Sequence, residues 1–265
     1  MTAMQDVCVD LAAEGSELAR LVAGLSPGQW SEPTPAAGWT VRHQVAHLAL
    51  VARLIDLAVR EPAAFTAETA PVRDDLDAGL TTLLAAHLAE PVPELLRHWA
   101  EWRAAAEKGL AATPRREEVP WLVGPLPASV LAAGGLMELF AHGQDIRDAL
   151  GVPVDLTDRI GHIAYLGTRT RDLAYRVRGL EPPAEPFRFE LTGPSGVAWA
   201  FGPEDAEQRI SGPAADFCLL VTRRRHRDDL ALTAVGAVAD HWLGIAQTYA
   251  GRPGPPPRRI GQYRV

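Results

Sequence analysis

The spacing of apolar residues divides the chain into a helical part and a part with strands. Near the N-terminus, apolar positions recur three, four or seven residues apart, as one face of a helix requires: Val7, Leu11, Leu18, Val22 and Leu25. The same period predicts helices over residues 41–60, 73–88, 94–110, 128–150 and 158–177, all flanked by proline or glycine. We therefore expect an all-helical first domain over residues 1–180.

The period changes after a proline-rich linker at residues 181–186. Apolar and polar residues alternate over 187–192 and again over 197–201, as in half-buried strands, and the Gly-Pro-Ser-Gly sequence between them predicts a hairpin. A third strand that ends in a turn is expected within 210–213, and helices over 214–222 and within 230–249. The second domain, residues 187–258, is thus expected to be a smaller α+β domain, and the fold class is mainly α.

One segment of the first domain breaks the helical pattern. Residues 113–127 contain four prolines, which lack the backbone N–H that helices and strands use. We expect a loop that crosses the surface or covers a pocket, with Trp121 pointing inward.

Composition limits the classes of protein. The 265 residues carry a net charge of −7 with a sequence pI near 5.6, which argues against a general nucleic-acid binder. The two cysteines form no CxxC motif, no apolar run approaches the roughly 20 residues of a membrane span, and the N-terminus lacks the pattern of a signal peptide. We expect a cytoplasmic monomer or homodimer without membrane or nucleic-acid partners.

Candidate metal ligands lie four residues apart in the apolar run 131–150. Glu138 and His142 share one face of the predicted helix, and a carboxylate and an imidazole one turn apart suit chelation of a divalent metal. About ninety residues earlier, His43 and His47 are also one turn apart. A single metal site between two packed helices follows from this pattern. The alternatives are a Glu138–His142 pair that faces solvent or closes on itself, and a hydrogen-bonded core position for His47.

Three further residues are candidates for catalysis. His43 is a fourth ligand, a group that orients a ligand or a proton carrier, unless it is only a polar residue near a helix start. Asp145 either orients His142 or pairs with Arg147 or Arg42. Arg223 opens the run Arg-Arg-Arg-His-Arg, which is either a solvated surface or a site for an anionic substrate or thiol cofactor. No GxSxG, GxGxxG or Walker-type loop is present.

Two segments resemble the signatures of the DinB-like, mycothiol-dependent maleylpyruvate isomerase superfamily. They are residues 36–48, AAGWTVRHQVAHL, and residues 138–147, ELFAHGQDIR. The resemblance implies an N-terminal four-helix bundle that binds a divalent metal, usually zinc, through His47, Glu138 and His142. Residues 210–217, ISGPAADF, resemble the sterol-carrier-protein-like domain that follows the bundle. The chain looks most like the actinobacterial, uncharacterised metal-binding branch of the superfamily.

The resemblance also implies a function. Three protein ligands leave an open position, as in catalytic zinc sites, although nickel, iron or manganese suit the same ligands. We expect a mycothiol-dependent isomerase or transferase acting on a small organic molecule, with His43 or Asp145 assisting proton movement and Arg223 holding a carboxylate. One alternative is a thiol-independent metal-dependent hydrolase or biosynthetic cyclase. Another is a non-catalytic protein that binds a metal and a small ligand.

Overall fold

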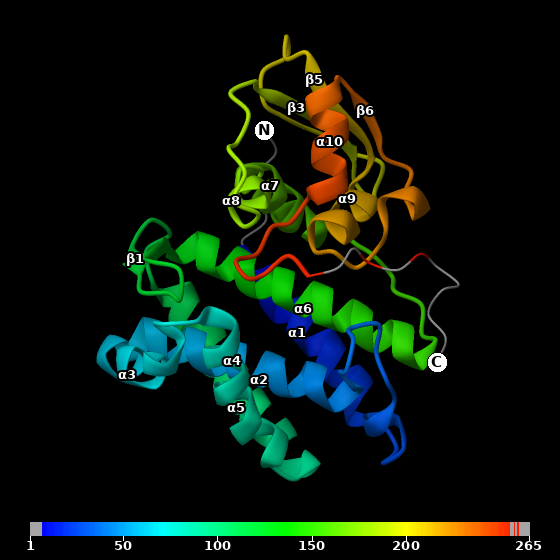
Figure 1. Ribbon diagram of the computed structural model, residues 1–265. Helices are drawn as coiled ribbons and strands as arrows, with labels where there is room; N and C mark the ends of the chain where they lie inside the picture. The colour runs from blue at the N-terminus through cyan, green and yellow to red at the C-terminus, as the bar shows by residue number, and fades with distance from the viewer. Residues whose placement is uncertain (1–6, 255–256, 258, 260–265) are drawn as a thin grey trace. The chain divides into compact units, whose positions relative to one another are not determined.

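The chain forms two compact units in the computed structural model, which describes residues 7–254, 257 and 259 (Figure 1). The units are Met1–Val154 and Asp155–Val265. Residues 1–6, 255, 256 and 258 of the two expected domains lie outside the described residues. The division falls earlier than the boundary near residue 180 that the change of period predicted.

Four long helices form the core of the first unit, and together they make the expected four-helix bundle (Figure 1). Helix α2 packs against α5 and α6, and α1 packs against the same two helices. The four are α1 (Val7–Ala23), α2 (Val41–Arg60), α5 (Val92–Ala112) and α6 (Ala128–Leu150). Their shared interior holds fully buried apolar side chains such as Leu18, Leu54, Leu95 and Leu136. The bundle therefore follows from the helical periods, because each helix has one apolar face to bury.

Shorter elements connect the bundle helices. They are η1 (Gln29–Ser31), α3 (Pro62–Glu68), η2 (Ala70–Val72) and α4 (Leu76–Ala89). Helix α4 begins after Asp75, whose side chain accepts a hydrogen bond from the Ala78 N–H at 3.0 Å. The expected loop over 113–127 is only partly a loop. It contains a small antiparallel pair, β1 (Glu118–Val119) with β2 (Leu126–Pro127), and Trp121 stacks on Phe65 with ring centroids 5.9 Å apart.

A four-stranded sheet with helices forms the second unit. The strands are β3 (Phe187–Thr192), β4 (Ala198–Phe201), β5 (Gln208–Pro213) and β6 (Thr233–Val235), in the order β4-β3-β5-β6. The predicted hairpin is confirmed, because β3 and β4 pair antiparallel; β3 pairs parallel with β5, and β5 antiparallel with β6. Phe217 and Trp242 of the covering helices are fully buried, and their rings contact that of Phe189 in β3.

The helices of the second unit include a segment that the period assigned to the first domain. The elements are η3 (Asp158–Ile160), α7 (Gly161–Arg169), α8 (Leu173–Arg176), α9 (Ala214–Val221), η4 (Arg227–Asp229) and α10 (Ala237–Ile245). Helix α7 packs against α9, and α8 against α10, so residues 155–180 belong with the sheet. The single helix predicted over 158–177 is also divided. Its chain turns at residues 170–172, where the Arg171 carbonyl accepts a hydrogen bond from the Trp242 indole at 3.0 Å.

Among the described residues, none of the helices combines the length and the apolar character that a bilayer span requires.

A glycine sets how closely α6 approaches its neighbours in the bundle. A Cβ atom added at Gly135 would lie 3.2 Å from Cδ1 of Ile55 and 3.4 Å from Cδ1 of Leu11, whereas one at Gly134 would meet nothing within 4 Å. Ile55 belongs to α2 and Leu11 to α1, so Gly135 allows α6 to pack against both helices one turn before Glu138.

This difference predicts unequal costs for two equivalent substitutions. Gly135→Val should lower the free energy of unfolding by about 1–3 kcal/mol, because the added methyl groups overpack the helix contact. Gly134→Val carries the same change in helix propensity and should stay within about 0.5 kcal/mol of the wild type. Denaturant unfolding followed by circular dichroism measures both. Equal values for the two variants would show that this packing does not limit the bundle.

Candidate metal centre

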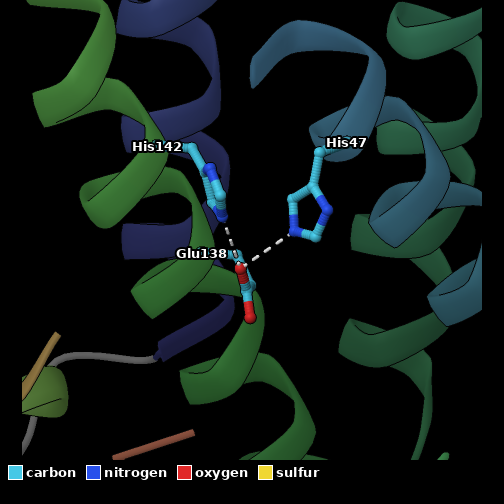
Figure 2. Close-up of side chains that lie close together, drawn as sticks. All are labelled: His47, Glu138 and His142. Atoms are coloured by element: carbon cyan, nitrogen blue, oxygen red, sulfur yellow. Dashed lines mark hydrogen bonds and ion pairs between the residues drawn. The ribbon is translucent and has the colours of Figure 1, made fainter. Parts of the chain in front are cut away.

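Two bundle helices bring three side chains to one point. His47 comes from α2, while Glu138 and His142 come from successive turns of α6 (Figure 2). Nε2 of His47 lies 3.2 Å from Oε2 of Glu138, and Nε2 of His142 lies 3.1 Å from the same oxygen. One ligand atom from each side chain falls within 4.8 Å of the others. The structure thus joins the three residues that the two motifs singled out.

The three side chains are mostly buried but keep an opening. Their exposed fractions are 17% for His47, 25% for Glu138 and 12% for His142. Burial raises the pKa of the Glu138 carboxyl, but the hydrogen bonds from His142 and His47 outweigh burial and hold that pKa well below its usual range. Glu138 is therefore an anion at neutral pH, and it is the single negative charge of this group.

A chain of hydrogen bonds determines which nitrogen of His142 carries a hydrogen. The Thr34 hydroxyl donates to the backbone carbonyl of Trp39 at 3.1 Å, so its oxygen accepts from the Gln44 amide nitrogen at 2.8 Å. The other end of that amide, its carbonyl oxygen, therefore faces Nδ1 of His142. A carbonyl only accepts hydrogen bonds. Nδ1 of His142 must then carry the hydrogen, and in the neutral ring Nε2 carries none.

This tautomer bears directly on whether the site fits a metal ion. Nε2 of His142 lies 3.1 Å from the anionic Oε2 of Glu138. Because Nδ1 already carries a hydrogen, Nε2 meets this oxygen either as the N–H of an imidazolium, which donates the hydrogen bond that lowers the Glu138 pKa, or as a lone pair with a cation between the two atoms. The N···O separations of 3.1 and 3.2 Å are close to the ~3.3 Å between two ligands of one tetrahedral ion with bonds of about 2.0 Å. Two imidazoles and one carboxylate are also a common zinc ligand set. The residues present fit a divalent cation.

Gln44 is the functional residue that the sequence analysis missed. It is fully buried, and it contacts the nitrogen of His142 that the spacing offered to Asp145. Groups that hold the second ring nitrogen of a ligating histidine fix its orientation and strengthen its binding to metal. The signal in the sequence is the separation of three between Gln44 and His47, which places both on one face of α2.

Trp39 covers the histidines from the loop before α2. The centroid of its ring system lies 5.6 Å from the His47 ring, 5.8 Å from the His142 ring and 6.1 Å from the His43 ring. The backbone carbonyl of the same residue anchors the Thr34–Gln44 chain. One residue therefore both shields the site and helps to fix its hydrogen-bonding pattern.

His43 lies one turn before His47 but has a different task in the structure. Its Nδ1 accepts a hydrogen bond from the Thr40 backbone N–H at 3.2 Å and also lies 2.9 Å from the Thr40 hydroxyl, which forms a capping box at the start of α2. Burial, and then the charge of Arg42, lower the pKa of His43. The ring is therefore neutral at neutral pH, with its hydrogen on Nε2. Within the described residues, His43 does not belong to the cluster of ligand atoms.

The other two candidate catalytic residues lie elsewhere. Asp145 is buried in α6, about one turn beyond His142. Arg223 belongs to the second unit, where it follows the end of α9 with a left-handed backbone (φ 59°). The structure provides no test of the catalytic role of either residue.

A second histidine–glutamate group shows the contrast with a metal centre. His87 Nδ1 lies 2.9 Å from one oxygen of Glu90, and His98 Nδ1 lies 2.5 Å from the other. Burial raises the pKa of Glu90. The hydrogen bonds from the two histidines lower it by more than burial raises it, so the net shift is downward. Each histidine contacts a separate oxygen of Glu90, so hydrogen bonds connect α4 to α5. Among the described residues, the ligand atoms of this group do not cluster as those of His47, Glu138 and His142 do.

Comparisons with known proteins bear on the identity of the chain. A family model described as the mycothiol maleylpyruvate isomerase N-terminal domain matches residues 11–147, which include all three candidate ligands. A model described as wyosine base formation matches residues 183–235. Uncharacterized proteins from two strains of Mycobacterium tuberculosis are each 46% identical over 246 residues, which cover 92% of this chain and 95% of theirs.

Solved structures support the same relationship at the level of the fold. Crystal structures of the mycothiol-dependent maleylpyruvate isomerase and of a histidine-to-alanine mutant of it match with a TM-score of 0.56 and 19% sequence identity. Each match covers 86% of this chain and 91% of the solved chain. The family that the two motifs predicted is confirmed: the chain belongs to the DinB-like superfamily of mycothiol-dependent maleylpyruvate isomerases.

Proposed function

We propose that the chain is a metal-dependent enzyme that acts on a small organic molecule with a thiol, mycothiol, as its co-substrate. The observation that carries this proposal is the convergence of His47, Glu138 and His142, in which Nε2 of each imidazole lies within 3.2 Å of one oxygen of the anionic Glu138. Membership of the isomerase family supports the choice of a thiol co-substrate and of an isomerisation or transfer as the reaction.

His47, Glu138 and His142 would hold the ion, and zinc is the first choice for this ligand set. Nickel, iron and manganese suit the same donors. When bound, the cation supplies Lewis acidity and lowers the pKa of a thiol or water on its open position. Glu138 contributes the one negative charge among the three protein ligands, so the site keeps a net positive charge that attracts a thiolate or a carboxylate.

The remaining residues prepare the site without contacting the ion. Gln44 holds the His142 ring so that Nε2 points at Glu138, and the Trp39 ring keeps water from one side of the histidines. His43 presents an Nε2–H group, which suits donation of a hydrogen bond to a bound substrate rather than removal of a proton from it. Asp145 is a second candidate for moving a proton, and Arg223 a candidate for holding a substrate carboxylate.

The metal content of purified protein tests the ligand assignment. We expect about one divalent ion per chain in the wild type, and a loss of at least nine-tenths of it in His47→Ala and in Glu138→Gln, because two remaining ligands bind weakly. His98→Ala removes an equivalent imidazole from the Glu90 group and should retain the ion. Elemental analysis measures all four proteins, and circular dichroism confirms their helicity. Full metal content in the two site variants would refute the assignment.

The orienting role of Gln44 predicts a weaker site without it. Gln44→Ala should lower metal affinity by about 10–100-fold, the usual effect of losing a group that orients a ligating histidine. Gln44→Glu keeps an acceptor oxygen for Nδ1 of His142 and should retain affinity within about tenfold of the wild type. Competition with a chromogenic chelator measures these constants. Equal affinity in Gln44→Ala and the wild type would show that the contact does not matter.

A turnover assay tests the reaction class. Maleylpyruvate, the substrate in the name of the structurally similar enzyme, is supplied with and without mycothiol, together with a panel of small electrophiles. We expect substrate loss only with the thiol present, and its disappearance in His47→Ala. Turnover without thiol would replace the proposal with a hydrolase or cyclase. A metal-loaded protein that turns over none of these compounds would leave the binding-protein alternative in its place.

A further inference from the structure

A cavity of about 400 Å³ lies within the second unit. Its walls are formed by α7, by the two residues that follow Thr170, and by strands β3 and β4. All of its lining residues fall in Asp155–Val265, whereas the three candidate metal ligands fall in Met1–Val154. Its volume is within the range of about 300–1,000 Å³ that is usual for small-molecule sites.

Aromatic rings form one wall of this cavity. Phe201 of β4 is paired in register with Phe189 of β3, so the two side chains lie on the same face of the sheet. Within the described part of the chain β4 is an edge strand, so no further strand extends this face beyond Phe201. The Tyr165 ring of α7 lies 5.8 Å from the Phe201 ring and remains 44% exposed. A flat apolar molecule placed here would cover aromatic surface that now contacts water.

Arg171 forms a fixed part of the cavity wall. Its guanidinium lies over the Phe187 ring, 4.7 Å from the centroid, and its Nε donates to Asp172 at 2.6 Å. It also donates to the backbone carbonyls of Pro183 and Glu185. The charge of Arg171 is thus balanced by Asp172, and its side chain is held in one position before any ligand binds.

Arg169 supplies a positive charge that no acidic side chain balances. It follows Tyr165 by one turn of α7, so both side chains belong to the same face of the helix. The Arg169 side chain makes no hydrogen bond or ion pair with any described residue, although the chain has 33 acidic residues against 26 basic ones. Asp172, the carboxylate in the cavity wall, is engaged by Arg171.

We infer that this cavity is a binding site for a small organic anion with a flat apolar body, such as an aromatic carboxylate. The apolar body lies against Tyr165 and Phe201, and the anionic group pairs with the Arg169 guanidinium. This inference uses only residues of the second unit, so it is independent of the proposed metal-dependent reaction.

Isothermal titration calorimetry of the full chain tests this inference. The two probes are 2-naphthoate and the neutral 2-naphthamide. The wild type should bind 2-naphthoate saturably and more tightly than the amide. Arg169→Gln should weaken naphthoate binding by about tenfold or more, and change the affinity for the amide by less than about twofold. Tyr165→Ala should weaken both probes, while Tyr165→Phe, which keeps the ring, should retain both.

Matched controls separate a specific site from general charge effects. Arg97→Gln removes the same charge from an exposed position on α5 and should leave naphthoate binding unchanged. Since Arg169 has no partner among the described residues, Arg169→Gln should keep the wild-type melting temperature, and Arg169→Lys should regain part of the affinity. The inference is overturned if the wild type shows no saturable binding of 2-naphthoate, or if Arg97→Gln and Arg169→Gln weaken it equally.

Discussion

The contact between Gln44 and His142 is the interaction on which the candidate centre depends. It is the last of three hydrogen bonds that begin at the Trp39 carbonyl, and a carbonyl can only accept, so the direction of every bond follows from that end. The loop before α2 thereby decides the tautomer of a histidine on α6. Without this chain, the neutral His142 ring could place its single hydrogen on Nε2, and that nitrogen would then have no lone pair for a cation.

Such a contact requires that α2 and α6 lie close together and do not slide. Gly135 allows the close approach, and buried apolar side chains on both helices hold it. The separation of the helices then sets the 3.2 Å distance between Nε2 of His47 and Oε2 of Glu138. Neither helix determines this distance by itself. The desolvation of Glu138 is offset because two imidazoles surround it, so an anion survives in a mostly buried position. The close packing of α2 and α6 is therefore also what stabilises the charge of Glu138.

Much of this could be predicted from local patterns, and the remainder depends on contacts between distant residues. Helical periods located the bundle helices, alternation located the β3–β4 hairpin, and a separation of four placed Glu138 and His142 together. Gln44 was missed because its role depends on a contact with His142, which lies 98 positions away in the sequence. The helix expected over 158–177 is divided where the Trp242 indole binds a backbone carbonyl, another long-range contact. The same packing moves residues 155–180 into the second unit, where periodicity alone could not place them.

The unbalanced charge of Arg169 extends this reasoning to the second unit. The chain has 33 acidic residues against 26 basic ones, yet the Arg169 side chain contacts none of the described carboxylates. Here Asp172 is engaged by Arg171, whose own position is set by the Phe187 ring and two carbonyls. Because Asp172 already pairs with Arg171, its carboxylate does not balance the charge of Arg169. A positive charge beside exposed aromatic surface is stabilised most by a ligand that offers both an anion and a flat ring, since either property alone leaves the other half of the cavity in water.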